Sequence, residues 1–312
     1  MKRIAGYLQF ASVTAWLLAA PQEVHAAAKP AANSKTATPA AASAPATPGV
    51  SASGRLVATA RSPYLGAMVM DAATGRVLFE DGASARGYPA STLKLMDLLV
   101  ILERIEARQL TWTNLVTVSA RAAKTGGSQV YLKEKEVFTV DELLFALMIQ
   151  SANDAAVALA EHVAGTAEGF VALMNRRAQE LGMKDTVFNS VHGLPPSAGQ
   201  RPDVTTARDF AILCRELLKH PYALRYTSTR ERPFRPGVPG KTIAMRSHNP
   251  LLGKVEGCDG LKTGYITAAG YSIAATAQRN GRRIIVVVLD SADRRERDAK
   301  AAELIERGFS LP

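Results

Sequence analysis

The sequence predicts an α/β domain of the α+β type, in which an antiparallel sheet of about five strands is formed by both ends of the folded chain. A helical region is inserted between those ends. Three observations predict this fold. Two β-rich runs flank a turn at 73–75, helical periodicity dominates from 89 to 221, and three further β-rich runs lie between 260 and 290.

The N-terminal 26 residues have the layout of a secretory signal peptide. Basic Met1-Lys2-Arg3 precedes an uncharged apolar run over 4–20, and small residues at cleavage spacing lead to Ala26. The apolar run is short for a membrane-spanning helix. We expect cleavage and export to the periplasm or cell envelope. An uncleaved anchor, with peripheral membrane contact, is the alternative.

Residues 27–61 are almost wholly Ala, Pro, Ser, Thr and Lys. Such a composition buries too little apolar surface to offset the entropy of ordering, so we expect a disordered tether. The folded domain is then expected over 62–312.

The net charge of the chain is +10, and the chain has two cysteines. The positive charge serves solubility, or it favours an anionic partner such as an envelope polymer or a phospholipid surface. No basic patch is interleaved with aromatic residues, so a nucleic acid is not expected as a partner. Two cysteines are too few for a disulfide-rich fold. Cys214 and Cys258 are either two buried free thiols or a single disulfide bridge.

The folded part begins with a predicted hairpin over 64–82 and a helix over 91–110. The helix follows Pro89 and carries leucines at helical spacing from Leu93 to Leu102.

The next segment, from 111 to 138, is polar, with strand-like pieces at 115–120 and 129–133. It separates the first helix from the main helical region, and its composition predicts loops with short strands.

Three helices follow. Thr139 is a good N-cap for the first, because Glu142 stands at the matching capping-box position. Gly182 ends the second helix, and Thr205 or Thr206 caps the third.

Three strands and a helix are predicted at the C-terminal end. The strands cover 260–266, 269–278 and 282–290, and Asn280-Gly281 is a strong hairpin signal between the last two. A helix over 296–309 follows them.

Ser91 and Lys94 form the first candidate catalytic pair. Their spacing of three puts both side chains on one helix face, within reach of each other. A serine hydroxyl is a poor nucleophile unless a base takes its proton. A partly desolvated lysine can be that base, because burial disfavours its charged form.

Ser151 and Asn153 form the second candidate pair, at the end of an apolar helical run. A hydroxyl at this place could relay a proton between the lysine and a leaving group, and an amide could hold a substrate backbone. Ordinary capping between two helices is the alternative.

The tripeptide Lys-Thr-Gly occurs twice, at 124–126 and at 262–264. On a strand, Lys262 and Gly264 share one face, while Thr263 points the other way. That face would present a cation to a ligand, and the glycine would let the backbone of the ligand approach closely. The edge of such a strand can pair with an extended peptide. The first copy lies in a polar stretch, and we interpret it as a coincidence without a functional role.

The order Ser-x-x-Lys, Ser-x-Asn, Lys-Thr-Gly is that of penicillin-binding proteins and serine β-lactamases. The segments "HGL…TARDFA" and "SHNPLL…DGLKTGYITAAGYSIAATA" also resemble D-alanyl-D-alanine carboxypeptidases. From about Tyr64 onward, the chain resembles a low-molecular-mass penicillin-binding protein of the D-Ala-D-Ala carboxypeptidase or endopeptidase family. The resemblance implies a β-lactamase-like, transpeptidase-like fold.

The resemblance implies catalytic roles. Ser91 would be the acylated nucleophile and Lys94 its general base. Ser151 and Asn153 would serve proton relay and substrate positioning. Backbone N–H groups of Ser91 and Tyr265 would form the oxyanion hole.

The resemblance also implies binding roles. Lys262 and Thr263 would help to bind the terminal carboxylate of the substrate, and Gly264 would let the substrate backbone approach. Arg297 matches the arginine before the last helix of the family, which reaches the same carboxylate. The Gly-Gly-Arg that precedes it in the family is replaced by Asp-Ser-Ala at 290–292, so a solvated arginine at a helix start is the alternative.

The expected function is a serine-type D,D-peptidase that acts on peptidoglycan stem peptides through a Ser91 acyl-enzyme. It would cleave either the D-Ala-D-Ala bond or a D-Ala–diaminopimelate cross-link, and β-lactams would acylate the same serine. A layout without a C-terminal β-domain, which we expect here, is that of the endopeptidase-like members.

Two other functions stay open at this point. One is a class A β-lactamase, although its Glu-x-x-Leu-Asn loop is not found between Asn153 and Lys262. The other is a non-catalytic protein that binds the cell wall. No metal or cofactor is expected, since no zinc-ligand spacing is found, and the histidines at 162, 192 and 248 need no catalytic role.

Overall fold

The computed structural model of the protein describes residues 47–312 apart from 236, 239 and 241. The predicted signal peptide and residues 27–46 of the predicted tether lie outside the described residues.

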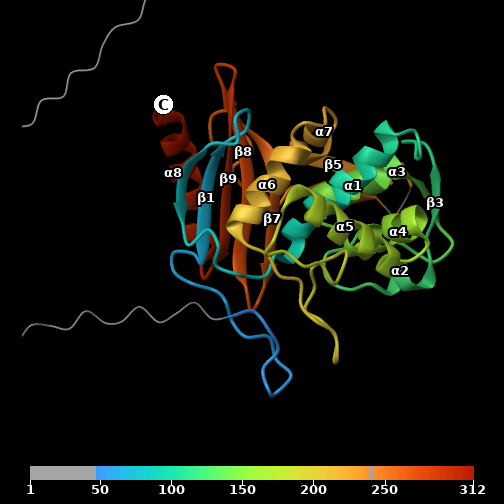
Figure 1. Cartoon of the computed structure of the whole chain (residues 1–312). Coiled ribbons are helices and arrows are strands. Elements are labelled where there is room, and N and C mark those ends of the chain that lie inside the picture. Colours follow the sequence, from blue (N-terminus) through green and yellow to red (C-terminus); the bar gives the residue numbers. More distant parts are fainter. Residues whose placement is uncertain (1–46, 236, 239, 241) are drawn as a thin grey trace, which may run out of the picture. The chain divides into compact units, whose positions relative to one another are not determined.

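A five-stranded antiparallel sheet built from both ends of the described chain confirms the predicted fold class (Figure 1). The strand order is β2-β1-β9-β8-β7, and every neighbouring pair is antiparallel. Asn280 and Gly281 have left-handed backbone, as a tight hairpin turn between β8 and β9 requires. The strands are β1 (Gly66–Asp71), β2 (Val77–Asp81), β7 (Cys258–Ile266), β8 (Gly270–Arg279) and β9 (Arg282–Ser291).

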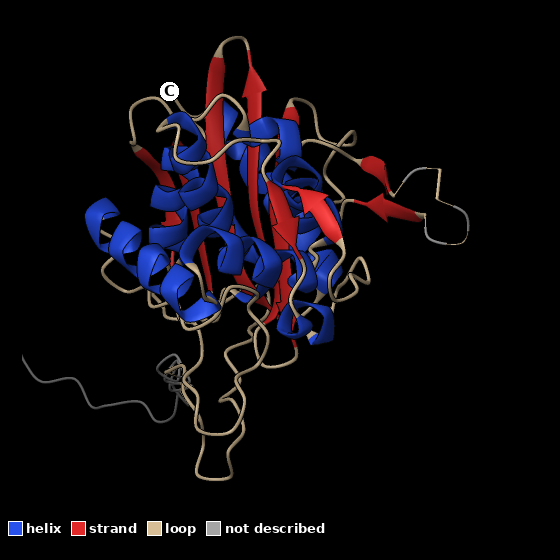
Figure 2. Cartoon of the chain, turned by 90° about the vertical axis from the view of Figure 1, so that its right-hand side faces the viewer, coloured by secondary structure: helices blue, strands red, loops and turns tan. Residues whose placement is uncertain are grey.

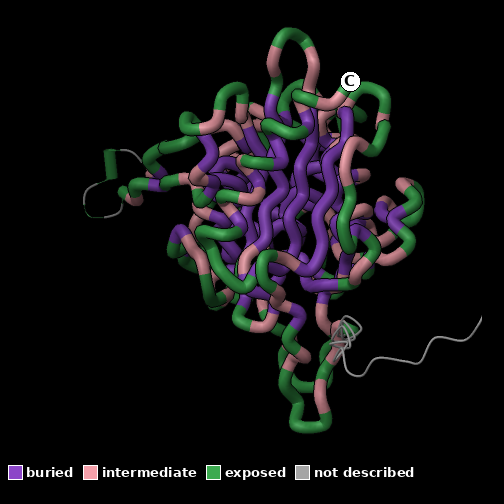
Figure 3. The backbone as a smooth tube through the Cα atoms, turned by 90° about the vertical axis from the view of Figure 1, so that its left-hand side faces the viewer, coloured by how far each residue is buried: buried purple, intermediate pink, exposed green. Residues whose placement is uncertain are grey.

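Helices cover both faces of this sheet. On one face, α8 (Arg294–Ser310) packs against side chains such as Val286 and Val288 of β9. On the other face, the alternate residues Ile285 and Val287 join the main core with α1 (Lys94–Glu106) and α6 (Ala207–Leu217). The central strands are buried along most of their length (Figure 3), which explains why β9 reads as a continuous β-branched run.

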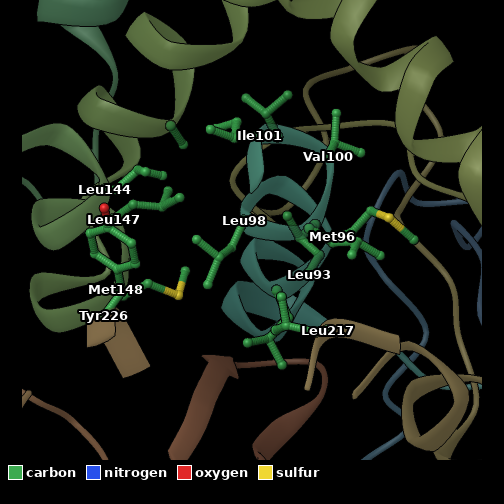
Figure 4. Packing of buried hydrophobic residues seen from close by; sticks show 14 of the residues in the cluster. Leu93, Met96, Leu98, Val100, Ile101, Leu144, Leu147, Met148, Leu217 and Tyr226 are labelled. Carbon is green, nitrogen blue, oxygen red and sulfur yellow. The ribbon is translucent and has the colours of Figure 1, made fainter. Parts of the chain in front are cut away.

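The inserted helical region packs around α1, which carries the first candidate pair at its start. Leu93, Met96 and Leu98 lie in one cluster with Leu147 and Met148 (Figure 4). Figure 1 labels the other helices of this region and its surroundings, and Figure 2 shows the helices in blue beside the strands in red. They are α2 (Ala120–Lys124), α3 (Val140–Phe145), α4 (Asn153–Ala164), α5 (Ala167–Leu181) and α7 (Ala223–Thr227).

The predicted helix caps are confirmed. Thr139 and Glu142 form a complete capping box at the start of α3. Gly182, in the left-handed conformation, ends α5, and the side chain of Thr206 caps α6. Each cap supplies a partner to a backbone group that the helix itself leaves unpaired.

The first predicted helix of this region is broken at the second candidate pair. After α3 the chain makes a π-helical turn, η2 (Ala146–Gln150), and Ser151 then adopts a left-handed conformation with φ of 59°. α4 begins at Asn153. A non-glycine residue in this conformation stores strain, and such residues are found at functional sites.

The segment from 111 to 138 differs in part from the prediction. β3 (Leu115–Thr117) pairs with β4 (Val137–Thr139), but the expected strand at 129–133 is absent and α2 was not expected. Asp154 explains the irregular course, since its buried carboxylate accepts hydrogen bonds from the backbone of Val130 and Leu132. A second hairpin, β5 (Glu231–Phe234) with β6 (Ile243–Arg246), was also missed.

The expected boundary between tether and domain lies at Ser62, but the structure shows contacts with the domain from several residues before it. Gly49 and residues 56–61 contact the domain, and Thr59 is fully buried, with its backbone N–H donating to the carbonyl oxygen of Ala268. The hydroxyl of Tyr88 accepts from Gly49 N–H. Composition hid this because most of these contacts are made by backbone groups, with Thr59 and the single apolar side chain of Leu56 added to them.

Both cysteines are free thiols. Cys214 is buried in α6, and burial raises its pKa far above the ordinary value. Cys258 begins β7, and partial burial raises its pKa to about 11. Protonated thiols of this kind behave as small apolar side chains.

No single helix of the described ranges is long and apolar enough to cross a membrane. α4 and α5 reach that length and composition together, but they meet at an angle of 83°.

Candidate active site

One cavity of about 310 Å³ gathers the three motifs from distant parts of the chain. It lies where the start of α1, the break before α4, β7 and the start of α8 meet. Its lining contains no carboxylate and has two arginines. The lining residues are Ser91, Ser128, Ser151, His248, Thr263, Gly264, Tyr265, Tyr271, Arg294 and Arg297.

Ser91 lies on a short 3-10 helix, η1 (Ala90–Leu93), that runs directly into α1. β7 passes very close to it. A Cβ added to Gly264 would lie 2.8 Å from the carbonyl oxygen of Pro89 and 3.1 Å from the amide nitrogen of Ser91. Glycine is therefore required at 264, because a side chain would push the strand away from the serine.

Lys94 is fully buried and reaches three oxygen atoms. Its Nζ lies 3.0 Å from Ser91 Oγ, 2.8 Å from Asn153 Oδ1 and 2.9 Å from the carbonyl oxygen of His192. A neutral amine has two N–H groups and one lone pair. The two carbonyl oxygens take the N–H groups, so the lone pair is left to accept the Ser91 hydroxyl proton.

Burial lowers the pKa of Lys94 to about 7. Asp97, Asp203 and Asp154 oppose this shift, because their charge would favour the protonated lysine. Burial also raises the pKa of Asp97 well above its usual range and that of Asp203 to about 6, which weakens the opposition. This acidic set was not predicted from the sequence, because it is recognisable only once the burial of each residue is known.

Ser151 and Asn153 are brought to the site but have different surroundings. Ser151 lines the cavity, and its buried hydroxyl has no hydrogen-bond partner among the described residues. Asn153 was expected to position the substrate. In the structure, Asn153 Oδ1 accepts from Lys94 Nζ, and Nδ2 donates to the carbonyl oxygen of Gly126 at 2.8 Å. Its amide therefore orients the lysine in this structure.

The second Lys-Thr-Gly lies on β7, as the sequence predicts. Thr263, Gly264 and Tyr265 line the cavity, whereas Lys262 is buried behind them and donates to the carbonyl oxygen of Thr263 at 2.9 Å. Burial lowers the pKa of Lys262 well below its ordinary value, and the charges of Lys94 and Arg297 lower it further. The two lysines thus disfavour each other's protonation.

Arg297 lines the cavity and is 2% exposed, so the alternative of a solvated arginine is wrong. Its Nη1 donates to the carbonyl oxygen of Ser272 at 3.0 Å, and its Nε donates to Asp298 at 2.8 Å. Burial lowers its pKa, but the guanidinium remains a cation at neutral pH.

Asp290, where the sequence departs from the family's glycine, is fully buried below the site. Its carboxylate accepts from the hydroxyl of Thr59 at 2.5 Å, from the backbone N–H of Tyr88 at 3.1 Å and from the hydroxyl of Ser272 at 3.1 Å. Gly87 makes room for it, since a Cβ there would lie 2.3 Å from Asp290 Oδ2. One carboxylate thus joins the N-terminal segment, the approach to Ser91 and β8.

The first Lys-Thr-Gly also lies near the site, through its backbone. Lys124 is exposed at the end of α2, but Gly126 provides the carbonyl oxygen that Asn153 binds. The side chains of this copy make no contact with the candidate catalytic groups that the structure shows.

A cluster with metal-ligand spacing among the described residues is formed by Glu103, Glu216 and His220, away from the cavity. Arg177 already occupies it, since its Nε and Nη2 lie 2.7 and 2.9 Å from the two carboxylates. A resident cation therefore neutralises these acids.

Known proteins are similar to this chain in sequence and in fold. The peptidase S11 family model, described as D-alanyl-D-alanine carboxypeptidase, matches residues 58–293. The chain is 36% identical over 244 residues to D-alanyl-D-alanine carboxypeptidase DacF of Bacillus subtilis, covering 78% of this chain and 61% of that protein. It is 37% identical over 249 residues to DacC of Escherichia coli, covering 78% and 60%.

One solved structure matches this chain over nearly the whole length of the solved protein. Penicillin-binding protein D2 from Listeria monocytogenes, in its ampicillin-bound form, is 32% identical with a TM-score of 0.70. The match covers 79% of this chain and 97% of that one. By contrast, the chain spans about 60% of the length of the curated relatives named above.

Proposed function

The chain belongs to the peptidase S11 family of D-alanyl-D-alanine carboxypeptidases, and from this premise we propose that it is a serine D,D-peptidase of peptidoglycan stem peptides. One observation carries the proposal. Ser91 Oγ lies 3.0 Å from the Nζ of a buried lysine whose pKa is lowered to about 7. A nucleophile is thus in contact with a base that is unprotonated in a large fraction of the molecules at neutral pH.

The proposed reaction begins with transfer of the Ser91 proton to Lys94 as Oγ attacks the carbonyl carbon of a D-alanine residue. The oxygen of that carbonyl takes up negative charge, which the backbone N–H groups of Ser91 and Tyr265 stabilise. The C–N bond then breaks. The leaving amine takes the proton from Lys94 through Ser151, whose hydroxyl is free to relay it.

The acyl group remains on Ser91 as an ester, and water hydrolyses it in the second half of the reaction. A carboxylate on the leaving residue binds to Thr263 and Arg297, since these two groups line the cavity beside Ser91. β-Lactams carry a carboxylate next to a strained amide, so they are expected to acylate the same serine.

The proposed location is the periplasm or cell envelope, where peptidoglycan is found. The signal-peptide pattern in residues 1–26 supports it. No metal or cofactor takes part in the proposed reaction.

Digestion of purified muropeptides tests the function. A pentapeptide that ends in D-Ala-D-Ala should lose one alanine, and mass spectrometry should show the tetrapeptide as the product. Ser91→Ala should form none. If the protein leaves both monomeric pentapeptides and cross-linked dimers unchanged, the proposed function is wrong.

A further inference from the structure

We propose that Arg294 forms a second anion-binding subsite at the mouth of the active-site cavity, for a carboxylate on a leaving group larger than D-alanine. This inference rests on the proposed D,D-peptidase function and deepens it. The preferred substrate is then a cross-link, in which the leaving group is a neighbouring acidic stem peptide attached through its diamino acid.

Two arginines enter the cavity from one turn of α8. Arg294 and Arg297 are three residues apart, so they lie on the same side of the helix, and both line the cavity. Their like charges repel, and both oppose the positive end of the helix dipole. This placement lowers the stability of the free protein, as expected where a site is arranged for an anionic ligand.

The two arginines differ in what already binds them. The guanidinium of Arg297 is held by Asp298 and by the carbonyl oxygen of Ser272. Arg294 is exposed and has no hydrogen bond or ion pair to another side chain in the described part of the chain. Its donors are free for a ligand, and guanidinium groups bind carboxylates in a bidentate manner.

The cavity provides nothing that would neutralise Arg294. No carboxylate lines it, and the other guanidinium of its lining belongs to Arg297, which is also a cation. A cleft with charges of one sign focuses its field on ligands of the opposite sign. One carboxylate, as on a D-alanine leaving group, engages Arg297 and Thr263, and leaves Arg294 without a partner.

Exposure gives the order of the two subsites along the cavity. Arg297 is 2% exposed, whereas Arg294 is exposed at the surface. Tyr265, which is 51% exposed, stacks on Tyr271 with ring centroids 4.5 Å apart and forms an apolar wall beside them. A leaving group that continues past Arg297 therefore passes Arg294 on its way to solvent. An acidic stem peptide has further carboxylates to place there.

Arg294→Ala and Arg294→Glu test this subsite, with Arg295→Ala and Arg295→Glu as matched controls. Arg295 is the exposed neighbour on α8 that does not line the cavity. The substrates are a muropeptide dimer cross-linked through D-Ala and diaminopimelate, and the monomeric pentapeptide. kcat/KM is measured for both, and the rate of acylation by benzylpenicillin monitors Ser91 chemistry in every variant.

We expect Arg294→Ala to lower kcat/KM for the dimer about tenfold, or about 1.4 kcal/mol, through KM. Arg294→Glu should lower it about 100-fold, since a charge reversal adds repulsion. The value for the pentapeptide should fall less than about threefold, and both controls should keep the wild-type ratio of dimer to pentapeptide cleavage.

The outcomes separate the two proposals. If Arg294→Glu keeps the wild-type ratio while benzylpenicillin still acylates it, the subsite is wrong and the D,D-peptidase function stands. Cleavage of the pentapeptide but not of the dimer by the wild type also overturns the subsite. If the wild type is neither acylated nor active on either substrate, the proposed function fails and the subsite with it.

Discussion

At the residue scale, the charge of Lys94 decides whether Ser91 can act as a nucleophile. The amine must be neutral to accept the proton, and burial lowers its pKa to about 7. We therefore expect the rate of acylation by benzylpenicillin to rise about tenfold per pH unit below pH 7 and to level off above about pH 8. Stopped-flow measurements from pH 5.5 to 9 check this profile. A rate that is flat or falls over this range would rule out the base role.

The two copies of Lys-Thr-Gly give a matched test of the binding residues. Lys262→Ala should lower the efficiency of acylation at least about 100-fold, because it removes the buried side chain that supports the cavity wall at Thr263. Lys124→Ala should change it less than about twofold, since this lysine is exposed. The same acylation assay on both variants is sufficient. Equal effects of the two substitutions would contradict the assignment.

At the element scale, the distance between β7 and η1 is set by the absence of a side chain at Gly264. Gly264→Ala should lower acylation at least about tenfold, because its Cβ would lie 2.8 Å from the Pro89 carbonyl oxygen and would displace the strand. Gly126→Ala is the control, since nothing lies within 4 Å of its Cβ. Acylation rates and melting temperatures of both variants separate this effect from loss of folding. Wild-type acylation by Gly264→Ala would show that the strand does not constrain the serine.

Elements with strong local signals could be predicted from the sequence. The capping box at Thr139, the glycine end at Gly182 and the Asn280-Gly281 hairpin depend on neighbouring residues, and the structure has all three. The end of the apolar run at Ser151 was visible in the sequence, which left a junction between two helices open. The π-helical turn before it and the left-handed conformation of Ser151 could not be predicted, since Ser151 is not a glycine.

The candidate site was predictable to the extent that its motifs are local. The order of Ser91, Ser151 and Lys262 indicated the chemistry, and the structure places these residues around one cavity or directly behind its wall. Two features of the site could be found only in the structure. The amide of Asn153 accepts a hydrogen bond from Lys94, and Arg294 lines the cavity. Neither contact follows from the spacing of these residues along the chain.

At the scale of the whole molecule, Asp290 ties the described N-terminal segment to the sheet and to the approach of Ser91. Asp290→Ala should lower the free energy of unfolding by about 3 kcal/mol, because it leaves buried donors of Thr59, Tyr88 and Ser272 unpaired. Asp290→Asn, which keeps one acceptor, should lower it by about 1 kcal/mol.

Urea unfolding of both variants measures these losses, with Asp259→Ala as a control. Asp259 pairs with Arg283 in a partly exposed position, so its removal should cost less than about 1 kcal/mol. If Asp290→Ala and Asp259→Ala are equally stable, the buried network does not hold the segment in place.

The formation of an acyl-enzyme on Ser91 is the central claim, and intact-mass analysis after treatment with benzylpenicillin tests it most directly. The wild-type protein should gain the mass of one benzylpenicillin molecule, and peptide mapping should place the adduct on the peptide that contains Ser91. Ser91→Ala should gain no mass. A wild-type protein without an adduct, or with an adduct on another residue, would contradict the claim.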